Sequence, residues 1–466
     1  MSSPADRPRD WAGRPVVVAG AGVSGAAAAR VLRERRALVT VVDRDEARAE
    51  PLRADGFAVL AADVPPPGTS LVVTSPGWRP DAPLLTAAAA AAIEVVGEVE
   101  LAWRLRPVGA APWLALTGTN GKTTAVRMLA AVLAAAGRRT VAAGNVGLAL
   151  LDAVLAPEPY DVIAVELSSF QLHWSSSVRP AAAALLNLAP DHLDWHGSAA
   201  AYAQDKAKVW AGPTSIGNGD DRQVREMLAR APGRQVRFTL REPDSDELGV
   251  VGNRLMDRAF DQPGPTELAG LTDLTVPGAH NVANALAAAA LARAYGVPPA
   301  AVAAGLRAFV PDAHRNQLVA TAAGVDWVDD SKATNPHAAA ASLAAYDAVV
   351  WLAGGLLKGA DVDELVRSAA SRLRAVVLLG RDRTPYRQAL ARHAPKIPVV
   401  EVDRLDTGAM REAVDSARRL ARAGDTVLLA PAAASMDCFR DYGQRGELFA
   451  QAARAAAARA VAGTSG

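Results

Sequence analysis

Several features that mark particular protein classes are scarce or missing in this chain of 466 residues. Its single cysteine, Cys438, excludes an internal disulfide and fits a reducing compartment, so we interpret it as a small buried side chain. The formal net charge is only +1, which argues against a general attraction to nucleic acid or to an anionic membrane. No apolar run reaches the roughly 18 residues of a membrane span, and the polar start MSSPADRPRDWAGRP lacks a signal-peptide core. We therefore expect a cytoplasmic globular protein.

The chain is rich in short apolar strands that alternate with helical stretches. Several stretches run from an apolar strand into small residues, a pattern typical of parallel α/β sheets. Examples are PVVVAGAGVSG, WLALTGTNGKTTAV and DTVLLAPAAAS. A polar stretch from residue 217 to 274 predicts irregular strands, and GAHNVANALAAAALARAYG predicts a helix. The sequence therefore predicts an α/β protein of three domains, over residues 1–107, 108–311 and 312–466.

The stretch LALTGTNGKTTAV is interpreted as a phosphate-binding loop between a strand and a helix. The usual pattern has a further glycine five residues before Gly121, where this chain has Leu116, so the loop is a variant. Its backbone N–H groups would form an anion nest, Lys122 would reach the β- and γ-phosphates, and the Thr123 hydroxyl would bind Mg²⁺. The predicted ATP-binding residues of this loop are Gly118, Thr119, Asn120, Gly121, Lys122, Thr123 and Thr124.

A second glycine-rich turn, GAGVSG, follows the first strand and opens a helix. With Asp43 at the end of the next strand, Gly20, Gly22 and Gly25 complete a dinucleotide fingerprint. Read alone, it predicts an NAD- or FAD-dependent oxidoreductase. The same geometry holds any diphosphate, including that of a UDP-sugar.

Acidic residues and a histidine follow two further strands near the phosphate loop. Glu166 stands at the end of the strand in VIAVELSSFQL, where a carboxylate can bind Mg²⁺. Asp191, His192 and Asp194 follow the strand in LLNLAPDHLDWHG, and we assign His192 a metal role. The residue pattern alone makes Lys206, in YAQDKAKVW, a solvated helix lysine.

Seven stretches in a fixed order resemble the Mur ligases, over about Val16 to Phe449. They are ELSSFQL, LNLAPDHLD, YAQDKAKVW, PGAHNVANALAA, HRNQLV, DSKATN and LAPAAASMDCFRDYGQRGELF. The resemblance implies a Rossmann-like UDP-binding domain, a central P-loop ATPase-like domain and a Rossmann-like C-terminal domain. It also implies an ATP-dependent ligase that adds D-glutamate to UDP-N-acetylmuramoyl-L-alanine through an acyl phosphate, in peptidoglycan precursor synthesis. The protein would be a monomer that uses two Mg²⁺ ions and binds neither nucleic acid nor membrane.

The same resemblance implies roles for individual residues. Lys122 and Thr123 would hold the phosphates and one Mg²⁺, which Glu166 also binds, and His192 would bind the second ion. Lys206 would be carbamylated by CO₂ and become a metal ligand, which requires a lowered pKa. The implied nucleotide contacts are Asn281, Asn284, Arg315 and Asp330. The implied sugar-nucleotide contacts are Val23, Ser24, Asp43, Ser75 and Asn145. The implied D-glutamate contacts are Lys332, Thr334, Lys358, Ser435 and Tyr442.

Three alternatives remain at this point. A folylpolyglutamate synthase also adds glutamate with ATP, but it lacks a UDP-binding first domain. An oxidoreductase built on GAGVSG would bind NADH or NADPH, which a ligase should ignore. A non-catalytic ATP-gated regulator would have no need of the metal-side residues Glu166, His192 and Lys206.

Overall fold

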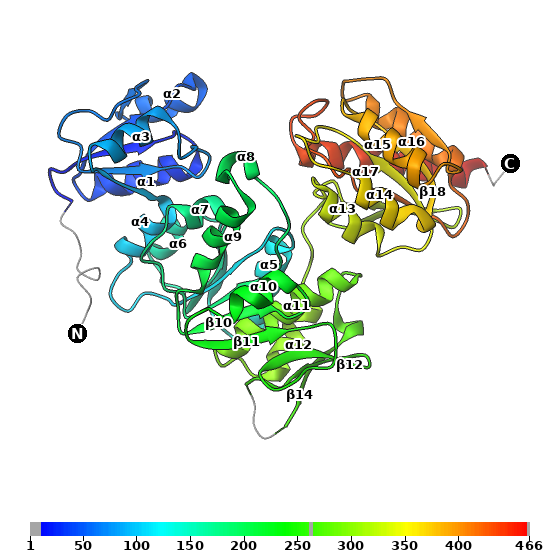
Figure 1. The fold of residues 1–466 in the computed structure, drawn as a ribbon, viewed down its shortest axis with the longest axis horizontal. Helices are drawn as coiled ribbons and strands as arrows, with labels where there is room; N and C mark the ends of the chain where they lie inside the picture. The colour runs from blue at the N-terminus through cyan, green and yellow to red at the C-terminus, as the bar shows by residue number, and fades with distance from the viewer. Residues whose placement is uncertain (1–10, 261–263, 464–466) are drawn as a thin grey trace. The chain divides into compact units, whose positions relative to one another are not determined.

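The computed structural model describes residues 11–260 and 264–463, which form three sheets flanked by helices (Figure 1). The predicted α/β class is confirmed. The chain divides into two compact units, of which the first comprises Met1–Leu274 and Val282–Phe309 and the second Thr275–Asn281 and Val310–Gly466. The first unit holds two of the sheets. The domain boundaries near residues 108 and 312 stay predictions.

The first sheet is parallel, with strand order β3-β2-β1-β4-β5. Its strands are β1 (Pro15–Ala19), β2 (Leu38–Val42), β3 (Ala58–Leu60), β4 (Leu71–Thr74) and β5 (Glu94–Gly97). Its helices are α1 (Val23–Glu34), α2 (Glu46–Ala54), α3 (Pro83–Ala90) and α4 (Glu98–Leu105). The chain reverses its direction of winding between β1 and β4, and ligands of such sheets bind outside the carboxyl ends of the strands at that point.

The central sheet has nine strands in the order β14-β13-β12-β11-β10-β9-β6-β8-β7. They are β6 (Trp113–Thr117), β7 (Thr140–Gly144), β8 (Val162–Glu166), β9 (Ala182–Leu185), β10 (Thr214–Asn218), β11 (Arg234–Phe238), β12 (Glu247–Val251), β13 (Arg254–Asp257) and β14 (Thr266–Gly270). The strands predicted between residues 217 and 274 exist, but β12, β13 and β14 pair antiparallel. A tight turn with Gly252 in the left-handed region joins β12 to β13, so no crossover helix intervenes.

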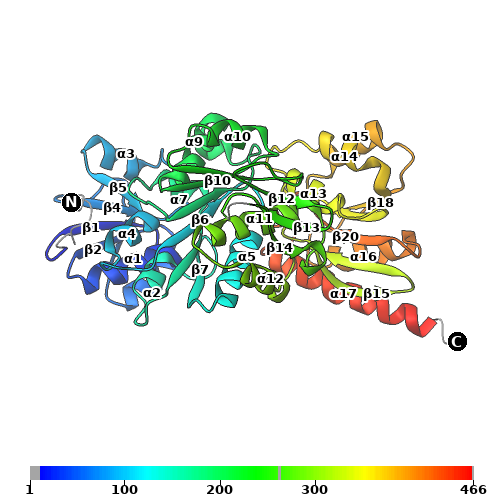
Figure 2. The ribbon, with the colours of Figure 1, turned by 90° about the horizontal axis from the view of Figure 1, so that it is seen from below.

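Helices cover both faces of the central sheet (Figure 2). They are α5 (Lys122–Ala135), α6 (Leu150–Val154), α7 (Ser169–His173), α8 (Leu193–His196), α9 (Ala199–Ala207), α10 (Arg222–Leu228), α11 (Ala279–Ala294) and α12 (Pro299–Ala308). The predicted helix in GAHNVANALAAAALARAYG is confirmed as α11. Helices α5 and α12 lie in close contact because Gly305 has no side chain: a Cβ there would stand 2.3 Å from Cα of Val132.

The second unit contains a six-stranded sheet in the order β15-β16-β20-β17-β18-β19. Its strands are β15 (Gln317–Ala322), β16 (Val325–Asp329), β17 (Val349–Ala353), β18 (Leu373–Leu378), β19 (Val399–Glu401) and β20 (Thr426–Leu429). Its helices are α13 (Pro336–Leu343), α14 (Asp363–Ala369), α15 (Arg383–His393), α16 (Ala409–Leu420) and α17 (Tyr442–Gly463). Only β15 runs antiparallel to its neighbour. Cys438 is 9% exposed, as predicted, and burial raises the pKa of its thiol to about 11.

Among the described residues no helix is both long and apolar enough to cross a membrane. The first ten residues, on which the expectation of a cytoplasmic protein partly rests, lie outside the described residues.

Two acidic residues of α4, which follows the first sheet, accept hydrogen bonds from segments that belong to the central sheet and its helices. Glu98 is 3% exposed and its Oε1 accepts a hydrogen bond of 2.8 Å from the backbone N–H of Leu151. Glu100 accepts hydrogen bonds of 2.9 Å from the backbone N–H groups of Ser176 and Ser177. Burial raises the pKa of Glu98 to about 7, whereas serine donors hold that of Glu100 below its ordinary value despite its burial.

Glu98 gives the protein a specific pH dependence of stability. Because its folded pKa exceeds its unfolded one, its contribution is fully present below the unfolded value near 4.5 and is lost as pH rises through about 7. The free energy lost is about 3 kcal/mol at most. We expect Glu98→Gln to remove this part of the pH dependence, so that its stability relative to the wild type rises between pH 5 and 8. Urea unfolding across that range measures it, with the exposed Glu50→Gln as control; parallel curves for wild type and Glu98→Gln would contradict it.

Candidate functional site

The phosphate loop connects β6 to α5, as predicted. Gly121 precedes the helix at φ +81°, and a Cβ there would stand 2.3 Å from Oδ1 of Asn284, so both backbone and space require glycine. The Lys122 ammonium folds back over the loop and donates to the backbone oxygens of Gly118, at 3.0 Å, and Thr119, at 2.9 Å. Its charge therefore lies at the helix N-terminus, where the phosphates of a nucleotide would bind.

Two residues that sequence reasoning missed hold this loop in shape. Asn187 accepts from the backbone N–H of Asn120 at 2.8 Å and donates to its carbonyl at 3.0 Å. The hydroxyls of Thr119 and Tyr202 lie 2.9 Å apart. Asn187 stands just past β9 in the quoted stretch LLNLAPDH, and that position was the available signal.

Glu166 ends β8 and is 1% exposed. Its Oε1 accepts a hydrogen bond of 2.8 Å from the side-chain amide of Asn145, whereas its buried Oε2 has no hydrogen-bond partner among the described residues. A buried carboxylate oxygen without a partner is costly unless a cation neutralises it. This oxygen therefore fits a Mg²⁺ ion, which prefers carboxylate ligands beside substrate phosphates. Asn145, predicted as a sugar-nucleotide contact, is placed beside this carboxylate.

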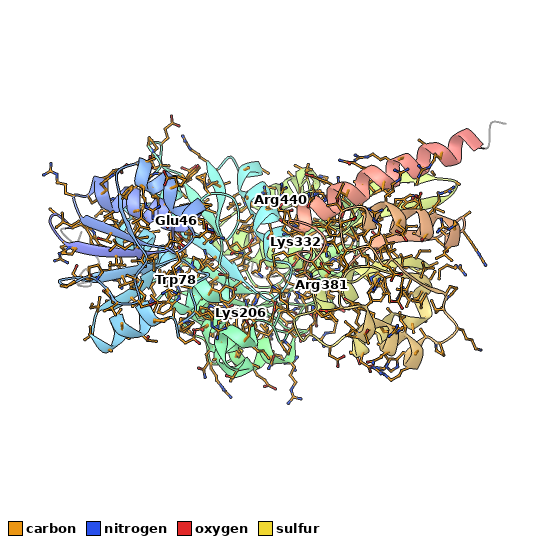
Figure 3. All side chains as sticks on the ribbon, turned by 90° about the horizontal axis from the view of Figure 1, so that it is seen from above. Glu46, Trp78, Lys206, Lys332, Arg381 and Arg440 are labelled. Carbon is orange, nitrogen blue, oxygen red and sulfur yellow. The ribbon has the colours of Figure 1, made fainter. Side chains whose placement is uncertain are left out.

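Lys206 lies on α9 (Figure 3). Its side chain is 1% exposed, so the interpretation of it as a solvated lysine is wrong. Its amine is 2.8 Å from the carbonyl oxygen of Gly118 and 3.3 Å from the hydroxyl of Thr117, which places it under the phosphate loop. Burial, and then the charge of Lys122, lower its pKa well below the ordinary value. The chain thus holds a lysine whose uncharged, nucleophilic form is favoured.

His192 directly precedes α8 and has a left-handed backbone conformation, at φ 52°. Its side chain is 48% exposed, and its ring lies 4.8 Å from that of Phe170. Burial is the main cause that lowers the pKa of His192. The positive charges of Lys122 and Lys206 lower it further, whereas the carboxylate of Asp191 acts to raise it. A neutral imidazole has a lone pair for a metal ion. Three segments of the chain bring Glu166, His192 and Lys206 together beside the phosphate loop. Their side chains lie close enough for Lys206 to interact electrostatically with Glu166, and for both His192 and Lys206 to interact with Lys122.

The glycine turn of the first sheet is held by Asp43. Its two carboxylate oxygens accept from the backbone N–H groups of Ala21, at 2.7 Å, and Asp45, at 2.9 Å, so the side chain braces the turn. A Cβ at Gly25 would stand 1.8 Å from the carbonyl oxygen of Gly20, which requires glycine there.

The remaining predicted contacts of the sugar nucleotide surround this turn. Val23 is 83% exposed and, with Ser24, begins α1. Ser75 follows β4, across the switch point, and its buried hydroxyl has no hydrogen-bond partner among the described residues. A cavity of about 720 Å³ is lined in part by Gly22 and Val23.

The predicted D-glutamate contacts of the second unit gather at one edge of its sheet. Lys332 and Thr334 follow β16, Lys358 follows β17, and Ser435 and Tyr442 follow β20, three adjacent parallel strands. The Lys332 ammonium stands 3.9 Å from the ring centroid of Tyr442.

The predicted nucleotide contacts are divided between α11 and the start of the second unit's sheet. Asp330 is half-buried, and its burial raises its pKa to about 6 against hydrogen bonds from Ser342 and Asn316 and the charge of Arg315, which lower it. Asn284 lies beside Gly121, and Asn281, 5% exposed, donates to the carbonyl of Pro277 at 2.7 Å.

One buried cation of the second unit escaped sequence reasoning. Arg445 has no exposed surface and donates to the hydroxyl and carbonyl oxygens of Ser331, at 2.9 and 2.8 Å, and to the carbonyl of Ala433, at 3.0 Å. It ties the segment after β16 to the segment after β20 and so fixes the loop that carries Lys332. No spacing in the sequence distinguishes it from the many surface arginines.

Comparisons with known proteins agree with this arrangement. The Mur ligase middle domain matches residues 116–292, the Mur ligase glutamate ligase domain residues 314–433, and the TrkA-N domain residues 16–67. Curated proteins named UDP-N-acetylmuramoylalanine--D-glutamate ligase from Streptomyces avermitilis and Thermobifida fusca are 58% and 60% identical to this chain, and each match covers 96% of it and 99% of the relative.

Solved structures show the same fold at low identity. A UDP-N-acetylmuramate-alanine ligase from Thermotoga maritima has a TM-score of 0.57 at 18% identity, covering 95% of this chain and 99% of that one. A pseudomurein peptide ligase type C from Methanothermus fervidus has a TM-score of 0.59 at 17% identity, covering 94% and 99%. The high identity of the curated relatives over nearly the whole length shows the family: the chain belongs to the Mur ligases.

Proposed function

We propose that this protein joins D-glutamate to UDP-N-acetylmuramoyl-L-alanine with ATP, forming an amide bond in peptidoglycan precursor synthesis. The observation that carries the proposal is the set of groups around the phosphate loop: the buried amine of Lys206, the unpartnered carboxylate oxygen of Glu166 and the ammonium of Lys122. A dinucleotide oxidoreductase has no use for this set. The names of the curated relatives support the choice of substrates.

The first step is transfer of the γ-phosphoryl group to the substrate's carboxylate. An oxygen of that carboxylate bonds to the γ-phosphorus, the bond to the β-bridging oxygen breaks, and ADP leaves. Two anions must approach each other, so the site has to offset their repulsion. Lys122 and the N–H groups of the loop are positioned at the helix N-terminus to do so.

The second step forms the amide. The uncharged amine of D-glutamate bonds to the acyl carbon, the carbon–oxygen bond to phosphate breaks, and the amine loses a proton. We propose that Lys332, Lys358 and the hydroxyls of Thr334, Ser435 and Tyr442 bind the two carboxylates of D-glutamate, since such anions need cationic or hydroxyl partners.

Two Mg²⁺ ions would supply Lewis-acid neutralisation of the phosphates: Thr123 and Glu166 would hold one, His192 would hold the second, and a carbamate on Lys206 would be a further ligand. The carbamate forms when the Lys206 nitrogen bonds to the carbon of CO₂ and releases a proton, which turns a cation into a carboxylate-like ligand. The lowered pKa of Lys206 favours this reaction.

We further propose that the protein works in the cytoplasm as a monomer.

Product formation tests the proposal. The protein is incubated with ATP, Mg²⁺, UDP-N-acetylmuramoyl-L-alanine and either D- or L-glutamate, and the products are identified by mass spectrometry. We expect a sugar nucleotide enlarged by one glutamyl residue with D-glutamate only. A product with L-glutamate alone, or none with either, would refute the proposal. NADPH binding, measured in parallel, would favour the oxidoreductase.

A further inference from the structure

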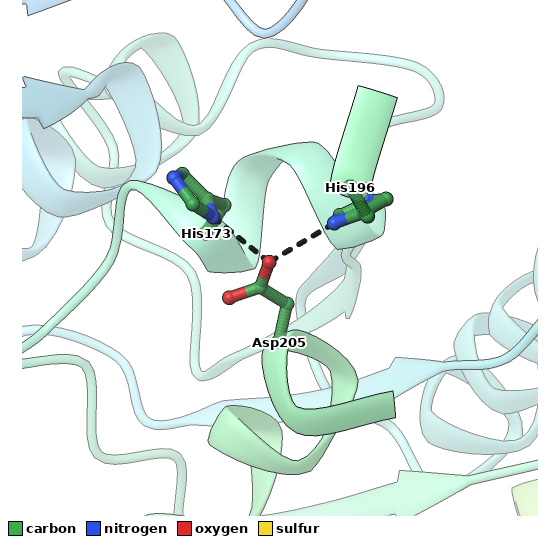
Figure 4. Close-up of side chains that lie close together, drawn as sticks. All are labelled: His173, His196 and Asp205. Atoms are coloured by element: carbon green, nitrogen blue, oxygen red, sulfur yellow. Dashed lines mark hydrogen bonds and ion pairs between the residues drawn. The ribbon is translucent and has the colours of Figure 1, made fainter. Parts of the chain in front are cut away.

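A buried network of side chains lies next to the metal-side residues without belonging to them. The fully buried ring of His196 has Nδ1 3.0 Å from Oδ2 of Asp205 and Nε2 3.0 Å from the hydroxyl of Ser169. Because a carboxylate only accepts, Nδ1 carries the proton, and Nε2 then accepts from Ser169. The same Asp205 oxygen lies 2.8 Å from Nδ1 of His173 (Figure 4).

These two imidazoles and the carboxylate could in principle hold a metal ion, since their ligand atoms lie within 4.8 Å of one another. However, Asp205 already accepts from both histidines and pairs with Lys208 at 2.8 Å. An ion there would displace hydrogen bonds that already satisfy these groups and would face the ammonium of Lys208. The arrangement is therefore better explained as a closed hydrogen-bond network.

The network joins three helices, and a metal-side residue lies on each helix or within three positions before it. Ser169 and His173 are the first and last residues of α7, which follows Glu166 by three positions. Asp205 directly precedes Lys206 on α9. His196 ends α8, the short helix that begins just after His192. Among the described residues, His196 is the side chain that hydrogen-bonds to both Ser169 and Asp205.

Aromatic packing keeps the bridging ring in place. The rings of His196 and Phe170 are stacked with centroids 5.6 Å apart, and Tyr202 and Trp195 approach within 5.3 and 4.5 Å. Phe170 also contacts the ring of His192.

We propose that His196 is a positioning residue that fixes the spacing between Glu166 and Lys206 by bridging α7 to α9. This inference rests on the proposed function, because it assumes that these two residues hold the metal ion. Groups that orient metal ligands typically contribute 10- to 100-fold to metal affinity. His196 itself need touch neither metal nor substrate.

The test measures Mn²⁺ binding in the presence of ADP by electron paramagnetic resonance, without turnover. His196→Phe keeps the ring packing and removes both hydrogen bonds; we expect it to raise the Mn²⁺ dissociation constant about 10-fold. His196→Asn restores the donor to Asp205 and should recover part of that affinity, which a packing role alone would not. The matched control is His393→Phe, which breaks the pair of His393 with Asp363 on α15 and α14 and should leave the constant unchanged.

A second variant, Ser169→Ala, distinguishes loss of the hydrogen-bonded bridge from a folding defect in His196→Phe. Ser169→Ala removes the other end of the bridge, and its effect combined with His196→Phe should be less than additive. Wild-type Mn²⁺ affinity in His196→Phe, or stoichiometric zinc in the isolated protein that is lost with His196, would overturn the inference. Because binding is read without turnover, a wild-type protein that binds Mn²⁺ and ADP but forms no amide would refute the proposed function alone.

Discussion

Lys206→Met is expected to lower D-glutamate-dependent phosphate release by about 1,000-fold or more, since the loss of a metal ligand removes several kcal/mol of charge stabilisation. Methionine matches the length and burial of the lysine but accepts no CO₂. The comparison is Lys396→Met, at an exposed lysine of the second unit.

The chemical identity of the ligand can be read separately from the rate. In ¹³C-bicarbonate, the wild-type protein should show a carbamate resonance that Lys206→Met lacks. The Lys206→Met variant should keep the wild-type fold, because the substitution replaces a buried polar group by an apolar one of similar volume. If Lys206→Met retains activity within tenfold of the wild type, Lys206 is not part of the metal site and the proposed role of its buried amine fails.

Glu166→Gln is expected to reduce the rate by about 100- to 1,000-fold and to raise the Mg²⁺ concentration needed for half-maximal activity. Glutamine can still accept from Asn145, so the β8 terminus keeps its hydrogen bond while the negative charge is lost. Initial rates over a Mg²⁺ titration provide the measurement. Glu158→Gln, an exposed acid paired with Arg139, serves as the control. An unchanged Mg²⁺ requirement would place the ion elsewhere.

The sequence predicts those parts of the site whose chemistry follows from neighbouring residues. The loop from Gly118 to Lys122 is predictable because strand, glycine turn and helix are contiguous. Glu166 is predictable because it ends a buried strand. Lys206 is different: its neighbours on α9 are polar or small, and its amine is buried by contacts with Thr117 and Gly118, which come from a distant segment of the chain. Its role therefore came from the family resemblance.

The residues that hold the site residues in place could not be predicted from the sequence, because their hydrogen-bond partners come from distant parts of the chain. Asn187, His196 and Arg445 act through partners 67, 27 and 114 residues away along the chain. No local periodicity records such pairings, and each residue taken alone is unremarkable for a turn, a helix end or a surface helix. In the central sheet, strands were predicted in the region of β13 and β14 but their antiparallel direction was not, because strand direction depends on the turn that precedes each strand.

Phosphate release from ATP in the presence of UDP-N-acetylmuramoyl-L-alanine, with D-glutamate, L-glutamate or no amino acid, tests the proposed reaction directly. We predict sustained release with D-glutamate only, because the acyl phosphate is consumed only when the correct amine attacks it. Equal release under all three conditions, or none under any, would contradict the assignment of this phosphate loop to amide formation.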